Sequence, residues 1–258
     1  MNDATRLEAL LKRDRVVVST GLILLTVLAW WALLDMAGDM AAMDSSSSMM
    51  HTWSMGDFLM LFVMWAIMMV GMMIPSAAPL ILTFATINRK KLEQNGSFVP
   101  TAVFVTGYLW VWTVFSLLAA GTQWGLHSLA LLSPMMVSQS PLLNGVLLIA
   151  AGLYQWAPLK RTCLEHCQSP LSFIMSHWRE GTGGALRMGW EHGLYCLGCC
   201  WVLMVLLFVM GVMNLAWVAV IAVFVLLEKI LPLGLWMGRV TGILLIAWGL
   251  WLARGVVL

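Results

Sequence analysis

The residues best able to do chemistry in this chain are its cysteines, which lie in two short groups. They are Cys163, Cys167, Cys196, Cys199 and Cys200. Spacings of three and four residues place side chains on one face of a helix. His166 adjoins the first group, and His192 precedes the second by one helical turn. Thiolates with imidazole nearby suit the soft ions Cu(I) and Zn(II) and suit Mg²⁺ or Ca²⁺ poorly. We therefore predict that the two groups converge on one small metal site.

Methionine adds a second soft-ligand pattern. Four of the 21 methionines are candidate thioether ligands: Met64, Met68, Met72 and Met73. Their spacing keeps them near one face of a helix. Thioether sulfur binds Cu(I) well, so these residues favour copper over zinc. The alternative interpretation is ordinary core packing, because methionine is also a flexible apolar filler.

The segments that must position these ligands are long apolar runs. The 258 residues are 61% hydrophobic and 10% charged, whereas soluble domains carry about 25% charged residues. Runs of about 20 apolar residues match the hydrocarbon thickness of a bilayer. We predict an all-α, polytopic transmembrane helix bundle forming a single domain. Its seven expected spans are 16–34, 58–87, 98–121, 141–157, 194–213, 215–231 and 235–253.

The distribution of Lys and Arg predicts the orientation of this bundle. Basic residues gather in the head 1–15, in residues 88–97 and in the connection 158–193, whereas 35–57 and 122–140 have none. The positive-inside rule then puts the N-terminus in the cytoplasm. The helical core, 58–258, presents its cysteines to the reducing side, and the Met-rich loop 35–57 faces outward. The net charge of +2 gives no reason to expect nucleic acid as a partner.

Other residues in the spans have two interpretations each. Pro75 and Pro79 predict a kink in the second span. The pair Glu228-Lys229 is either a functional intramembrane charge or an anchor at the membrane interface. Three glycines spaced four apart predict close helix packing; they are Gly234, Gly238 and Gly242.

Four motifs together resemble a bacterial family of predicted metal-binding integral membrane proteins. They are Met68–Ser76, Tyr154–Lys160 with the cysteine pair after it, Cys196–Met204 and Glu228-Lys229. Some members of that family are regarded as copper chaperones for copper oxidases such as polyphenol oxidase. The resemblance covers nearly all of the chain beyond the first span. It implies a multi-pass protein of the bacterial inner membrane whose partners are the lipid bilayer and a copper-dependent enzyme or other membrane subunits.

Three functions are compatible with these patterns. The first is a copper chaperone or relay that catalyses no reaction itself. The second is a membrane thiol oxidoreductase using Cys196 and Cys199 as a redox pair, because a helix start lowers the pKa of a thiol. The third is a subunit of a membrane metalloenzyme. We expect the first.

Overall fold

The computed structural model describes residues 3–44, 55–93, 99–128, 141–212 and 214–254. These residues contain helices and no strand, which confirms the all-α prediction. The helices are α1 (Asp3–Asp44), α2 (Met55–Glu93), α3 (Thr101–Ser128), α4 (Pro141–Tyr154), α5 (Pro158–Gln168), α6 (Pro170–His177), α7 (Gly181–Val205), α8 (Leu207–Met210), α9 (Leu215–Ile230) and α10 (Gly234–Arg254).

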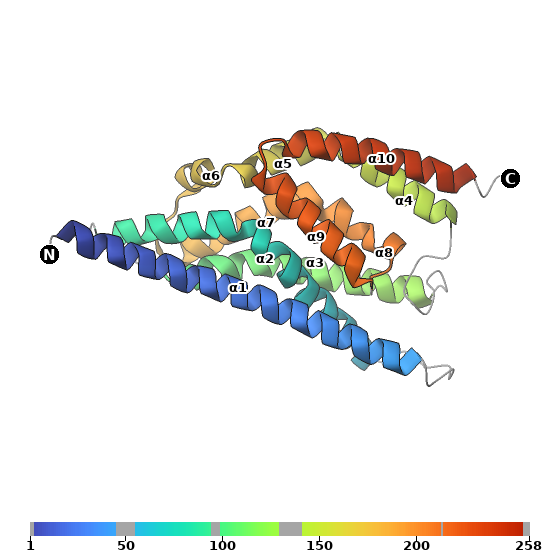
Figure 1. The fold of residues 1–258 in the computed structure, drawn as a ribbon, viewed down its shortest axis with the longest axis horizontal. Helices are drawn as coiled ribbons and strands as arrows, with labels where there is room; N and C mark the ends of the chain where they lie inside the picture. Colours follow the sequence, from blue (N-terminus) through green and yellow to red (C-terminus); the bar gives the residue numbers. More distant parts are fainter. Residues whose placement is uncertain (1–2, 45–54, 94–98, 129–140, 213, 255–258) are drawn as a thin grey trace.

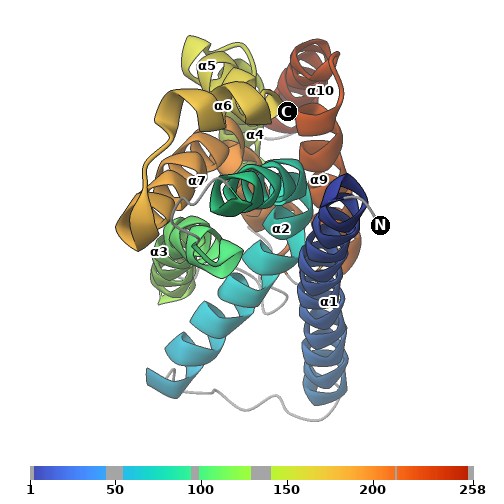
Figure 2. The ribbon, with the colours of Figure 1, turned by 90° about the vertical axis from the view of Figure 1, so that its left-hand side faces the viewer.

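The long helices lie roughly along one axis of the molecule (Figure 1). Helices α5 and α6 lie at the end where α1 begins, and Figure 2 looks onto this end. The most extensive pairings join α3 to α7, α4 to α10, and α1 to α2, while α5 packs on α7. Helix α7 thus receives α3 and α5 on its sides, and its cysteines lie between other helices.

In the described part of the chain, five helices are long and apolar enough to cross a membrane. They are Arg15–Asp39, Met55–Lys91, Thr101–His127, Gly181–Met210 and Gly234–Arg254. The bent pair α4 and α5, which meet at 61°, would make a sixth. Helix α9 has 16 residues, or about 24 Å, less than the roughly 30 Å of bilayer hydrocarbon. Seven spans and a cytoplasmic N-terminus remain predictions.

The fold differs from the prediction in the connection 158–193. This stretch forms α5, α6 and the first half of α7, so the span expected at 194 begins at Gly181. The charged residues that led us to expect a connection form ion pairs with each other in the helix. For example, Arg187 Nε lies 2.9 Å from Glu191 Oε1. Gly189 packs against the α3 backbone, which lets this polar half of α7 lie on α3.

The predicted outer loop 35–57 also begins later than expected. Helix α1 continues to Asp44, and α2 begins at Met55. Residues 45–54, which hold two of the methionines of this loop, Met49 and Met50, lie outside the described residues.

Helix α2 changes direction along its course (Figures 1 and 2) and contains Pro75 and Pro79. Proline has no N–H, so Pro75 cannot donate to the carbonyl of Gly71, four residues earlier. The indole Nε1 of Trp30 donates to this carbonyl instead, at 3.3 Å. A freed carbonyl within an apolar bundle needs such a partner, so the bend ties α2 to α1.

Small residues bring α4 and α10 together. A Cβ added to Gly242 would lie 2.8 Å from the carbonyl oxygen of Gly152, and one added to Gly249 would lie 2.7 Å from that of Gly145. Gly234, Gly238 and Gly242 are all buried, as the predicted close packing requires. The backbones of α4 and α10 touch only because glycine has no side chain at these positions.

This packing predicts opposite effects for two Gly-to-Ala substitutions. Gly242→Ala forces the two backbones apart and lowers the thermal unfolding midpoint in detergent. Gly121→Ala, in α3, meets nothing within 4 Å and removes a flexible residue from a helix interior, which stabilises by about 0.5–1 kcal/mol. Its midpoint stays the same or rises. Equal shifts in both variants would contradict the packing argument.

Candidate metal centre

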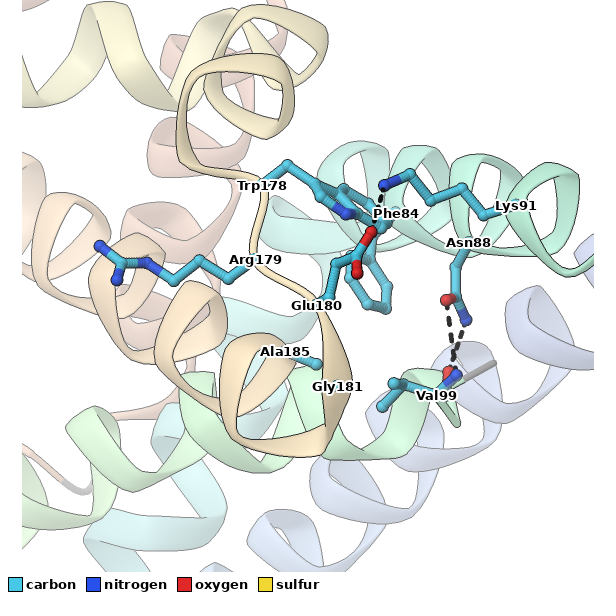
Figure 3. Close-up of a pocket in the computed structure, with 9 residues that line it drawn as sticks. All are labelled: Phe84, Asn88, Lys91, Val99, Trp178, Arg179, Glu180, Gly181 and Ala185. Carbon is cyan, nitrogen blue, oxygen red and sulfur yellow. Dashed lines mark hydrogen bonds and ion pairs between the residues drawn. The ribbon is translucent and has the colours of Figure 1, made fainter. Parts of the chain in front are cut away.

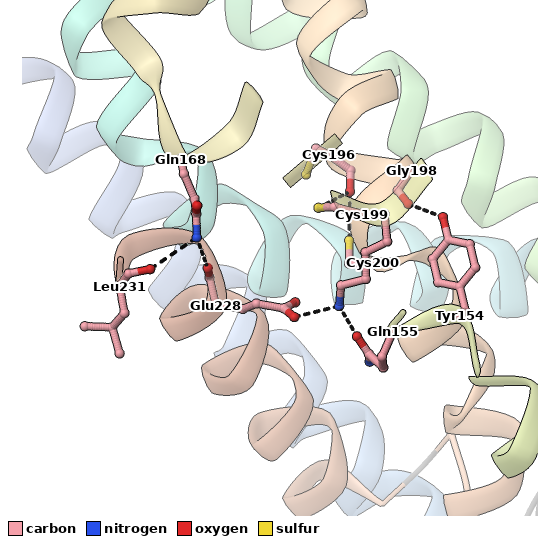
Figure 4. Close-up of polar contacts among 10 residues, drawn as sticks. Tyr154, Gln155, Gln168, Cys196, Gly198, Cys199, Cys200, Glu228 and Leu231 are labelled. Carbon is pink, nitrogen blue, oxygen red and sulfur yellow. Dashed lines mark hydrogen bonds and ion pairs between the residues drawn. The ribbon is translucent and has the colours of Figure 1, made fainter. Parts of the chain in front are cut away.

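The three cysteines of α7 face the interior of the bundle. Cys196, Cys199 and Cys200 are at most 1% exposed. The Cys199 thiol donates to the carbonyl oxygen of Cys196 at 3.0 Å, and the Cys200 thiol donates to the same oxygen at 2.9 Å. One turn of α7 therefore gathers two thiols beside the carbonyl oxygen of the third cysteine (Figure 4).

Helix α5 brings the other two cysteines to this turn. Cys163 packs directly against Gly198 of α7. A Cβ added to Gly198 would lie only 2.6 Å from the Cys163 sulfur, so glycine leaves the room that this contact needs. The Cys167 side chain lies close enough to Cys199 for the two thiols to interact. All five cysteines are free thiols. The structure thus brings the two groups together, on helices that α6 separates in sequence.

A lysine is buried against these thiols. Lys229, from the last turn of α9, is 6% exposed. Its Nζ donates to the Cys196 sulfur at 2.8 Å and to the Ser76 hydroxyl at 3.1 Å. Within the described ranges, no carboxylate lies within ion-pair distance of Lys229. An ammonium ion removed from water needs a compensating negative group, and the neighbouring sulfur is placed to supply it as a thiolate.

The same contacts close a ring of hydrogen bonds across four helices. The Ser76 hydroxyl donates to the carbonyl oxygen of Met73 at 3.0 Å. The Tyr108 hydroxyl donates to that carbonyl at 3.1 Å and lies 3.1 Å from the Cys196 sulfur. Helices α2, α3, α7 and α9 each contribute a member. The kinked part of α2 thereby becomes part of the thiol environment.

A second buried charge cluster lies beside the first. Lys160 Nζ, on α5, lies 2.6 Å from Glu228 Oε1, and both side chains are at most 2% exposed. Lys160 also donates to Gln155 (Figure 4). The interfacial-anchor interpretation of Glu228-Lys229 is therefore wrong, since both side chains point inward. Glu228 neutralises the Lys160 ammonium group, whereas the Lys229 ammonium group donates to the Cys196 sulfur.

The two candidate histidines have different surroundings. His192 is 2% exposed and stacks on the Tyr108 ring, with centroids 5.6 Å apart. Its Nδ1 has no hydrogen-bond partner among the described residues. A buried imidazole nitrogen thus lies unpartnered one helical turn from Cys196. His166 instead lies flat on the Tyr195 ring, with centroids 4.3 Å apart. The structure places His166 in a group of rings.

The candidate methionines are part of the hydrophobic core. They are Met64, Met68, Met72 and Met73, each at most 6% exposed. Their burial agrees with the packing interpretation, and thioether binding of copper remains a prediction. Among the residues that the structure describes, no group of three or more His, Cys, Asp and Glu side chains is placed so that it could hold a metal ion. Binding at the thiols therefore requires them to turn away from Lys229 and the backbone.

A small surface pocket lies apart from this centre (Figure 3). Lys91 lies over the Trp178 ring, 4.4 Å from its centroid, and 3.4 Å from Glu180. Asn88 pairs with the backbone of Val99 at 2.5 Å and 3.5 Å. These contacts join the end of α2 to the starts of α3 and α7, so the pocket is structural.

Sequence reasoning missed the polar residues that hold the thiols. Lys160, Tyr108 and Ser76 were not candidates, and Lys229 was considered only as part of the Glu228-Lys229 pair, with no link to the thiols. The available signal was position: Lys160 precedes Cys163 by three residues, and Glu228-Lys229 closes an apolar segment. A charge in such a place is costly unless it is paired or functional.

Comparison with known proteins agrees with this description. Residues 62–252 match the family PpoB2, described as a copper chaperone. The matched stretch is well over half of the chain and contains all the candidate ligands. No curated protein and no solved structure matches the chain.

The buried pair Lys160–Glu228 predicts a strongly non-additive double-mutant cycle. Lys160→Met leaves the Glu228 carboxylate buried without its cation, which costs about 3–5 kcal/mol. The double variant Lys160→Met, Glu228→Leu removes both charges and recovers most of that loss. Unfolding in a graded denaturing detergent measures the four stabilities. Additive effects would show that the two charges do not interact.

Proposed function

The chain belongs to the PpoB2 family of copper chaperones, and on that premise we propose that it binds Cu(I) at the buried thiols of α5 and α7. It acts as a membrane-embedded chaperone or relay that delivers this copper to a copper-dependent enzyme such as a polyphenol oxidase. One observation carries the proposal: free thiols of α5 and α7 pack against one turn of α7, where the buried Lys229 ammonium group donates to the Cys196 sulfur.

Charge balance supports Cu(I) over Zn(II) as the cargo. Cu(I) held by two thiolates carries one negative charge, which Lys229 neutralises, because Lys160 is already paired with Glu228. Zn(II) held by the same two thiolates is neutral, so it would need a third thiolate to compensate the ammonium group. Zn(II) also requires four ligands in a tetrahedron, whereas Cu(I) accepts fewer and softer ones.

We extend the proposal to the membrane. The protein crosses the bacterial inner membrane seven times, with its N-terminus in the cytoplasm. The basic end of α2, together with α5 and α6, lies at the end where α1 begins (Figure 1), as the positive-inside rule requires. Helix α9 returns from the opposite end to the start of α10 and serves as a short crossing, which local thinning of the bilayer accommodates.

The burial of the thiols argues against the oxidoreductase alternative. Cys196 and Cys199 are 0% and 1% exposed, while thiol–disulfide exchange requires a partner sulfur to reach the attacking thiolate. A metal ion needs a much smaller passage. The geometry therefore favours carriage of copper.

The proposal predicts that the purified protein retains Cu(I) against a moderate chelator. Cys196→Ser with Cys199→Ser removes two thiolates and abolishes most of this copper, measured by elemental analysis after dialysis. Met175→Ser is the control, since it removes a sulfur from a side chain that is 74% exposed on α6, and it keeps the wild-type content. Wild-type protein that takes up no Cu(I), or a double variant that keeps a full load, would refute the proposal.

A further inference from the structure

Two half-exposed histidines stand outside the buried centre, and their rings are held in fixed places. His166 on α5 stacks on Tyr195, with the planes 2° apart. His177 on α6 stacks on Phe173, with centroids 4.6 Å apart. The two imidazole centroids are 6.4 Å apart. Four rings from three helices therefore fix the positions of the two imidazoles relative to each other.

Hydrogen bonds also hold the Nδ1 atom of each imidazole. His166 Nδ1 lies 2.8 Å from the Thr162 carbonyl oxygen, and His177 Nδ1 lies 3.1 Å from that of Phe173. A carbonyl oxygen only accepts, so His166 Nδ1 carries the proton and its neutral Nε2 keeps its lone pair. His177 Nδ1 also lies 2.8 Å from the Ser176 hydroxyl, which can donate or accept. Histidines that bind metals have the arrangement of His166, in which one ring nitrogen donates to a carbonyl and the other binds the ion.

From this geometry we propose that His166 and His177 form a surface port that receives Cu(I) and passes it to Cys167. This inference rests on the proposed function and adds the route by which Cu(I) reaches the buried thiols. Cys167 follows His166 directly in α5, is only partly buried, and interacts with Cys199. Imidazole, partly buried thiol and buried thiol thus follow one another from α5 onto α7.

The chemistry sets the direction along this path. Two neutral imidazoles hold Cu(I) as a cation, and thiolates bind soft Cu(I) more tightly. At each exchange a Cu–S bond replaces a Cu–N bond, and a thiol that was protonated releases its proton to water. Copper remains Cu(I) throughout and no electron is transferred. The ion therefore moves inward, from the weaker surface ligands to the stronger buried ones.

The test uses the full-length protein and Cu(I) supplied as its bis(bicinchoninate) complex, whose colour fades as the protein takes the metal. The variant His166→Phe with His177→Phe keeps both stacked rings and removes both ligand nitrogens. We expect uptake about tenfold slower, at the lower end of the effect of disturbing a metal ligand, with the same final copper content. His127→Phe, at the far end of α3, is the matched control and keeps the wild-type rate.

Each other outcome is decisive. An unchanged rate in the double variant overturns the port and leaves the thiol site standing. A lost final load overturns it too, because the imidazoles would then be the resident site. If the double variant unfolds below the wild-type midpoint, each single variant is measured, and a single variant that folds normally and loads at full speed overturns the port. Wild-type protein that takes no Cu(I) refutes the proposed function instead.

Discussion

The central physical constraint in this structure is the burial of the Lys229 ammonium group against the Cys196 sulfur. A charge in an apolar interior is tolerated only where neighbouring groups compensate it. Here the compensation comes from a thiol, a hydroxyl and the groups bonded to them, supplied by four helices. Packing, the kink in α2 and the chemistry of the thiols are therefore linked. A change in any member of the ring exposes the others to an unpaired charge.

Much of the fold follows from the sequence, because apolar runs predict helices and the cysteine spacing predicts one face of α7. The convergence of α5 with α7 also follows from two ligand groups near each other along the chain. The start of α7 was not predictable, since Arg187 and Glu191 resemble loop residues until their pairing is seen. The place of His166 depends on Tyr195, a contact that no local pattern encodes.

The roles of the lysines illustrate the same limit. Glu228 and Lys229 are neighbours in sequence, and an interfacial anchor was a reasonable interpretation. Their side chains reach different partners, because Lys160 from α5 occupies the carboxylate and leaves Lys229 for the thiols. Only the tertiary arrangement shows that the cluster has one cation more than its carboxylate can balance. A Cu(I) ion held by two thiolates, as proposed, would balance that excess charge.

The central claim is that Cu(I) is bound by sulfur inside the bundle and nowhere else at one equivalent. X-ray absorption at the copper edge tests this most directly, because it identifies the atoms that surround the ion. The account predicts a first shell made only of sulfur in protein loaded with one equivalent of Cu(I). A first shell dominated by nitrogen or oxygen would contradict it.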